Sequence, residues 1–110
     1  MIIIKFADFG EFLCGRDRGA IVYDTIVNSG APYGESFDCG PIFCDFTGVK
    51  AMDHGFCDVV FGQWVMCWPG TIYLDRNMPD GLMPAFDTVA ETRCIKFDFM
   101  DAEKAEEITP

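Results

Sequence analysis

Short apolar segments alternate along this chain with segments whose apolar residues recur at helical spacing, and this order constrains the fold more than any other feature. The apolar segments are IIIKF, PIFCDF, TIYLD and CIKFDFM, at residues 2–6, 41–46, 71–75 and 94–100. The segments with a helical repeat are residues 16–28, 53–68 and 77–93. Parallel strands can be joined only by a crossover of about a dozen residues or more. The order therefore predicts an α/β fold with a single central mixed sheet and alternating helices.

Local signals place the ends of these segments. Residues 29–41 are rich in glycine, serine and proline, so we expect the longest loop there. Asp53 stands at the start of the second helical segment, where a carboxylate can cap the first turn. Pro69 ends that helix. We expect one domain over residues 1–100, followed by an acidic C-terminal tail, residues 101–110, that is frayed.

Composition limits the class of partner. A chain of 110 residues, 50% of them hydrophobic, can bury one sizeable core. It has 18 acidic and 8 basic residues, and the formal net charge of -10 opposes binding to nucleic acid phosphates and to anionic lipid. The composition therefore favours a protein partner, without direct contact with nucleic acid or a membrane.

The sequence also carries expectations about compartment and cofactors. The initial run of isoleucines stops at Lys5, and no apolar run reaches the length of a signal peptide or a membrane span. Four of the six cysteines, Cys14, Cys44, Cys57 and Cys67, lie among apolar neighbours, which is typical of reduced core cysteines. We therefore expect a cytoplasmic protein. With one histidine and no CxxC pair, the sequence predicts no metal site and no cofactor.

Three motifs, in order, resemble those of the STAS-like domains, distant relatives of the anti-sigma factor antagonists of bacterial partner-switching pathways. The central motif is a strand that ends in an aspartate and an aromatic residue, a Gly-Val turn, and a helix that runs to Phe-Gly. Its residues here are Asp45, Phe46, Gly48, Val49, Phe56, Asp58, Phe61 and Gly62. An Arg-x-x-Gly helix opening lies upstream in FGEFLCGRDRG, through Phe9, Leu13, Arg16 and Gly19. The segment LDRNMPDGLMPAFDTV is similar to the strand, asparagine and short helix that follow in the family, so the resemblance covers roughly residues 3–92.

The resemblance implies a regulatory module that binds a protein through the turn and helix at residues 52–58. The implied partner is a histidine-kinase-like ATPase or a regulator that such an ATPase controls. In classical anti-sigma antagonists a serine at the start of this helix accepts phosphate, and the added charge breaks the complex. The corresponding residues here, Met52 to Phe56, include no serine or threonine. We therefore expect partner binding of the switching type without a serine phosphosite.

The candidate partner-binding residues are Asp53, His54, Gly55, Asp58, Arg16 and Trp68. His54 can change its charge near neutral pH, so partner contact, phosphorylation and catalysis are alternatives for it, beside an ordinary place on the polar surface. Arg16 either contacts a partner or pairs with a carboxylate of the same chain. Trp68, at a helix end, is expected to be partly exposed, whereas Trp64 shares the apolar helix face and belongs to the core. Because there is no nucleophile elbow, P-loop or metal-ligand cluster, we predict no enzyme.

Two alternatives remain open. An acidic protein of this size, phage-encoded or not, could imitate a nucleic acid backbone and inhibit a nucleic-acid-binding defence or regulatory complex. Ordinary solubility explains the same charge with fewer assumptions. The domain could also form a homodimer through an edge strand at residues 94–100.

Overall fold

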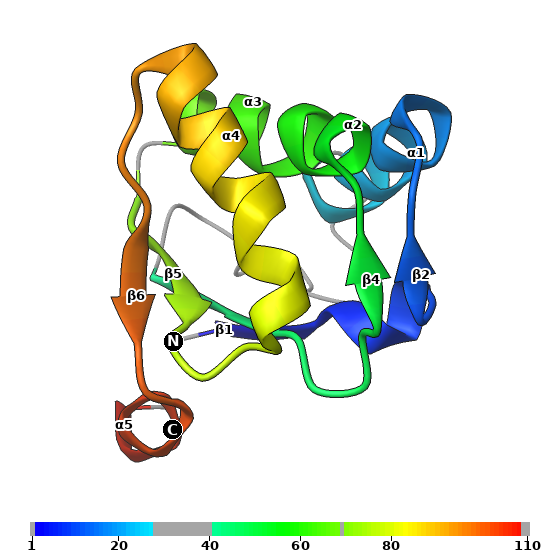
Figure 1. The fold of residues 1–110 in the computed structure, drawn as a ribbon. Helices are drawn as coiled ribbons and strands as arrows, with labels where there is room; N and C mark the ends of the chain where they lie inside the picture. The colour runs from blue at the N-terminus through cyan, green and yellow to red at the C-terminus, as the bar shows by residue number, and fades with distance from the viewer. Residues whose placement is uncertain (1, 28–40, 69, 109–110) are drawn as a thin grey trace.

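Within the residues that the structure describes, the central sheet has four strands, and every pairing between them is parallel (Figure 1). The computed structural model describes residues 2–27, 41–68 and 70–108. The strands are β1 (Ile2–Lys5), β3 (Ile42–Asp45), β5 (Ile72–Asp75) and β6 (Asp98–Met100), in the spatial order β1-β3-β5-β6. The predicted α/β class and the alternation of strands with helices are confirmed. The sheet predicted as mixed is parallel over the described strands.

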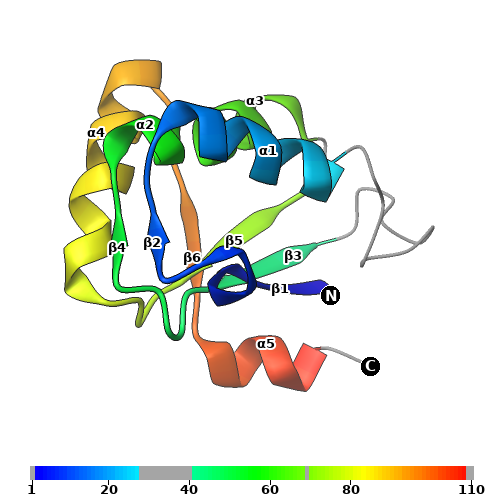
Figure 2. The same ribbon diagram turned by 90° about the vertical axis from the view of Figure 1, so that its right-hand side faces the viewer.

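Helices α1 to α4 cover one face of this sheet (Figure 2). Their bounds are Arg16–Val27 for α1, His54–Cys57 for α2, Gln63–Cys67 for α3 and Met83–Arg93 for α4. A π-helical turn, η2 (Asp58–Gly62), joins α2 to α3, so residues 54–67 form one continuous helical segment. Two short 3-10 turns, η1 (Phe6–Phe9) and η3 (Asp80–Leu82), follow β1 and precede α4. The helices predicted at 16–28 and 53–68 are confirmed to within a residue or two at each end.

Aromatic rings fill the space between the sheet and these helices. The rings of Phe6, Phe46, Phe61 and Phe86 are each at most 1% exposed. Phe46 and Phe61 contact each other, and each of them also contacts Phe6 and Phe86, with centroids 5.0 to 5.7 Å apart. Trp64, also 1% exposed, packs against Phe61 at 6.2 Å, as the sequence predicted. Burying one such ring stabilises the fold by about 2–3 kcal/mol, so this cluster fixes the helices on the sheet.

A second, two-stranded sheet lies beside the central one and leads into two of the helices. β2 (Phe12–Leu13) pairs in parallel with β4 (Ala51–Met52), and the two strands run side by side into α1 and α2 (Figure 1). Leu13 and Met52 are buried, whereas Phe12, opposite Ala51, is 59% exposed. The prediction of a single sheet missed this pair because each strand has only two residues.

The C-terminal residues form a helix that the sequence analysis did not predict. α5 (Ala102–Ile108) lies on the sheet face opposite α1 to α4 (Figure 2). Ala105 is fully buried there beside Phe43 and Met100, with Ala102 packed against the same group. The expectation of a frayed tail from residue 101 is therefore wrong, because two alanines three positions apart give this acidic segment one apolar face.

The last strand begins four residues later than predicted. Cys94 has a left-handed backbone, with φ of 54°, and Ile95 N–H donates to the Ala90 carbonyl at 3.0 Å. This pattern closes α4 and turns the chain, so that β6 begins only at Asp98. β6 forms an edge of the central sheet, but only three of its residues pair.

Three further expectations from the sequence concern the burial of four cysteines, a long loop and membrane-spanning segments. Cys44 and Cys57 are buried as predicted. Cys14 and Cys67 are exposed, contrary to the prediction, because Cys14 follows the last residue of β2 and Cys67 is the last residue of α3. The loop predicted at residues 29–41 falls outside the described residues except for Pro41. Within the described residues, no helix combines the length and apolar character needed to cross a membrane.

Candidate functional site

Asp53 fixes the backbone at the junction of β4 and α2. Its Oδ1 accepts a hydrogen bond from Phe56 N–H at 2.8 Å, which caps the helix as predicted. Gly15 N–H donates to both carboxylate oxygens, at 3.1 and 3.0 Å. Asp53 N–H in turn donates to the Leu13 carbonyl at 3.2 Å. Asp53 therefore joins the start of α2 to the segment between β2 and α1, and its side chain holds the site together.

His54 is the first residue of α2 and is exposed on this fixed backbone. Gly55 follows it and lies under the Arg16 side chain, since a Cβ at Gly55 would come within 3.2 Å of Arg16 Cγ. The absence of a side chain at Gly55 thus lets Arg16 pass from α1 across the start of α2. His54 and Arg16 both present polar groups to solvent at this junction.

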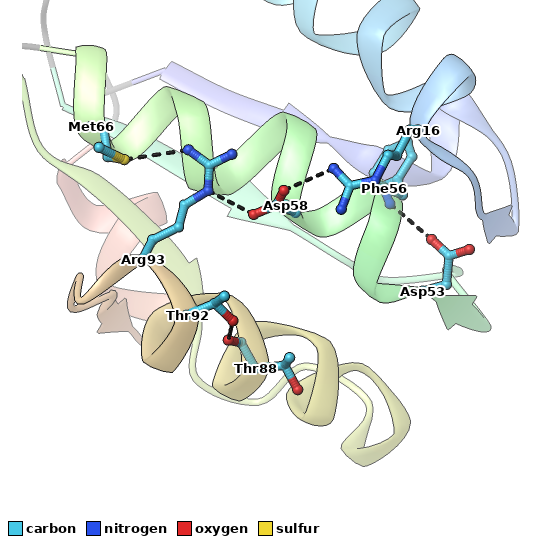
Figure 3. A network of polar contacts seen from close by, with 8 residues as sticks. All are labelled: Arg16, Asp53, Phe56, Asp58, Met66, Thr88, Thr92 and Arg93. Carbon is cyan, nitrogen blue, oxygen red and sulfur yellow. Dashed lines mark hydrogen bonds and ion pairs between the residues drawn. The ribbon is translucent and has the colours of Figure 1, made fainter.

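Asp58 lies between two arginines from different helices (Figure 3). Arg93 Nε donates to Oδ1 at 2.6 Å, and Arg16 Nη1 donates to Oδ2 at 2.9 Å. The hydrogen bond from Arg93, helped by that from Arg16, lowers the pKa of the Asp58 carboxyl to about 2, against the opposing effect of desolvation. The Asp58 side chain is only 13% exposed. It therefore connects α1 and α4 through the π-helical turn, and both its oxygens are already engaged within the chain.

Two glycines let the helices approach closely enough for this connection. A Cβ at Gly62 would lie 2.6 Å from Arg93 Nε, a separation that packed atoms do not tolerate. A Cβ at Gly19 would lie 3.2 Å from Val59 Cβ and 3.3 Å from the Phe56 carbonyl oxygen. The Arg-x-x-Gly and Phe-Gly motifs of the sequence thus serve packing around Asp58.

The structure brings together five of the six predicted site residues. Asp53, His54, Gly55, Asp58 and Arg16 form one group at the ends of α1 and α2. Trp68 lies beyond the far end of α3, about 20 Å along the helical segment at 1.5 Å per residue. It is half-buried, and its ring meets that of Trp64 edge-on with centroids 6.3 Å apart.

Sequence reasoning missed two residues of this region. Arg93 is 35 positions from Asp58, and no local pattern marks an arginine at a helix end as the partner of a particular carboxylate. The second missed residue is Phe12. Successive side chains of a strand point to opposite faces, so an aromatic residue directly before the apolar Leu13 could have been expected on the exposed face. Its exposure beside Ala51 extends the candidate surface from α2 onto the small sheet.

The metal-ligating and nucleophilic side-chain types near this site are the groups that bear on its chemistry. Among the described residues, no group of three histidine, cysteine, aspartate or glutamate side chains is arranged to hold a metal ion. Cys57, next to Asp58 in sequence, is buried, and desolvation raises the pKa of its thiol, which opposes formation of a thiolate nucleophile. The groups that the site exposes to solvent are the imidazole of His54, part of the guanidinium of Arg16 and the aromatic ring of Phe12.

Comparisons with protein-family models, with curated proteins and with solved structures give no match for this chain.

Proposed function

We propose that this chain is a regulatory, STAS-like module of the cytoplasm that has no catalytic activity and binds a protein partner through residues 52–58. The resemblance of its ordered motifs implies a partner-switching role, with a histidine-kinase-like ATPase or its regulator as the partner. Because residues 52–56 contain no hydroxyl side chain, the switch acts without a serine phosphosite.

The proposal rests on the exposed His54, whose backbone is fixed by Asp53, and on the exposed Phe12 of the paired strand β2. We call the surface formed by Phe12, Ala51, His54 and Arg16 the β4–α2 surface. Phe12 is 59% exposed, and large aromatic rings that remain in water are typical anchors of protein interfaces. A rigid backbone loses little conformational entropy on binding, so such a surface binds more tightly than a mobile one.

The distribution of acidic side chains favours this proposal over mimicry of nucleic acid. A mimic needs its carboxylates on one face, but α4 and α5 carry exposed acidic residues on opposite sides of the sheet (Figure 2). Several other carboxylates serve the fold, since Asp45, Asp53, Asp58 and Asp75 accept hydrogen bonds within the chain. The remaining charge is dispersed, as solubility alone would require.

Affinity capture with matched variants tests the β4–α2 surface. The bait proteins are the wild type, His54→Ala, Phe12→Ser and the control Lys104→Ala, whose side chain is exposed on α5 across the sheet. Asp53 is left unchanged because its loss would disturb the backbone. Each bait is used at low and at moderate salt, and captured proteins are quantified by mass spectrometry.

We expect one partner to be retained at both salt concentrations by the wild type and Lys104→Ala, and to be depleted about tenfold by His54→Ala or Phe12→Ser. A partner retained equally by all four baits would contradict this surface. A partner bound only at low salt, with a basic nucleic-acid-binding surface, would favour the acidic inhibitor instead, because screening weakens charge mimicry steeply.

A further inference from the structure

An open groove runs along the exposed side of α1; it shares Arg16 with the β4–α2 surface but does not include His54. Its volume is about 740 Å³, within the range of about 300–1,000 Å³ that is usual for ligand clefts. The side chains that matter along it are Phe9, Arg16, Arg18, Ile21 and Thr25, contributed by η1 and successive turns of α1. The groove is therefore a preformed feature of the helix face.

Arg18 is held in place at one wall of this groove. Its Nη2 donates to the Phe9 carbonyl at 2.6 Å. Gly10 lies beneath the guanidinium, with φ of 134°, and a Cβ there would come within 2.7 Å of Arg18 Nη2. Only glycine accommodates both this backbone conformation and this side chain. A guanidinium has five N–H donors, so the bond to Phe9 leaves the group able to receive a carboxylate through others.

The charge of the groove differs from that of the chain as a whole. Two arginines, Arg16 and Arg18, and one acidic residue, Asp17, line the groove, whereas the chain carries a formal net charge of -10. Arg16 also donates to Asp58, which is not part of the lining, so Arg18 supplies the larger share of the available positive charge. Two of the chain's eight basic residues are thus concentrated in one concave place. A groove of this charge attracts carboxylates at short range, while the surrounding negative charge repels long polyanions such as nucleic acid.

The groove also has an apolar component. Ile21 is 68% exposed, the largest exposed fraction among the large hydrophobic side chains of the described residues. Phe9 is half-buried and also lines the groove. An occupant with one apolar side chain next to its carboxylates would cover Ile21 while it pairs with Arg18.

We propose that this groove binds an acidic peptide segment of a protein partner, with carboxylates on Arg18 and Arg16 and an apolar side chain on Ile21. Arg18 is the anchor, because the Phe9 carbonyl and Gly10 orient its guanidinium before the peptide arrives and so lower the entropic cost of binding. The site does not use His54, and it stands whether or not the β4–α2 surface binds a partner.

The test is a titration of the isotopically labelled, full-length protein with a short peptide, followed by NMR of the backbone amides. The probe is acetyl-Glu-Glu-Leu-Glu-amide, and the matched control peptide has glutamine in place of each glutamate. The protein variants are Arg18→Gln, Ile21→Ser, His54→Ala and Lys104→Gln. Because Ile21 is exposed, its replacement tests the groove even if Arg18→Gln disturbs η1.

We expect shifts of the amides of residues 9–10 and 14–25 with a dissociation constant of about 1 mM or lower. Arg18→Gln and Ile21→Ser should each weaken the peptide at least about fivefold, and His54→Ala and Lys104→Gln should leave it unchanged. Absence of shifts in these amides, equal shifts with the glutamine peptide, or full binding by both groove variants would overturn the proposal. Loss of partner capture by His54→Ala with normal peptide binding would separate the two surfaces.

Discussion

Replacing Asp58 with asparagine keeps the size of the side chain and removes the charge that Arg16 and Arg93 share. The pKa of the Asp58 carboxyl is about 2, against an ordinary value of 3.8. Since a tenfold change in proton affinity corresponds to about 1.4 kcal/mol, the ionised carboxylate contributes up to about 2 kcal/mol to the free energy of unfolding. Arg16 is 57% exposed, and screening by water reduces the expected loss in Asp58→Asn to about 1–2 kcal/mol at pH 7.

Because the pKa of Asp58 is lowered in the folded chain, the free energy of unfolding depends on pH. The pKa of Asp58 is lower in the folded chain than in the unfolded one, so the unfolded chain binds its proton first as the pH falls. The stabilisation is therefore fully present above about pH 4 and is lost as the pH falls through the range from about 4 to about 2. The difference in stability between wild type and Asp58→Asn should shrink across this range.

Urea denaturation, followed by the fluorescence of the two tryptophans, measures both effects. The matched control is Glu11→Gln, since Glu11 and Lys50 form a pair at 3.5 Å whose side chains are 59% and 63% exposed. That exposed pair should change stability by less than about 0.5 kcal/mol. Equal stability of Asp58→Asn and the wild type at pH 7, or a difference between them that does not change between pH 5 and pH 2.5, would refute this contribution of the Asp58 carboxylate.

Three further predictions concern the fold around the site. Asp53→Ala removes the helix cap and the contact with Gly15, and should lower the free energy of unfolding by about 1–2 kcal/mol in urea denaturation; a loss within error of zero would contradict the capping role. Gly62→Ala should lower the free energy of unfolding by about 1–3 kcal/mol, because the added methyl group displaces Arg93. The same substitution should cost less in a protein that already carries Asp58→Asn; if the two losses simply add, Arg93 is not involved. A thiol reagent, with sites assigned by mass spectrometry, should modify exposed Cys14, Cys67 and Cys94 in the native protein, and should reach Cys44 and Cys57 only after unfolding, because burial raises the pKa of both thiols.

Strong local patterns were enough to predict much of the fold. The repeat in residues 16–28 and the capping position of Asp53 each depend on neighbours in sequence, and both are confirmed. Where the pattern was weak, the prediction failed. The apolar face of α5 consists of Ala102 and Ala105, small side chains that an abundance of glutamate concealed, although alanine, glutamate and lysine all favour helix.

The contacts of Asp58 with Arg16 and Arg93 join residues far apart in the sequence, so no local sequence pattern predicts them. Sequence analysis singled out Asp58 and Arg16 as residues that could meet a partner, or, for Arg16, a carboxylate of the same chain. In the structure Arg16 pairs with Asp58 of the same chain, at 2.9 Å. Arg93, 35 positions after Asp58, binds the other carboxylate oxygen. Spacing along the chain could not select Arg93 because its approach depends on how α4 crosses η2 at Gly62.

The most direct test of partner binding is backbone hydrogen exchange, measured for the protein alone and for its complex with the captured partner. We expect slower exchange on binding in residues 12–16 and 51–57, the segments that form the β4–α2 surface. Protection confined to β6 or α5, with unchanged exchange in these segments, would contradict this expectation and would place the interface at the sheet edge or on the opposite face.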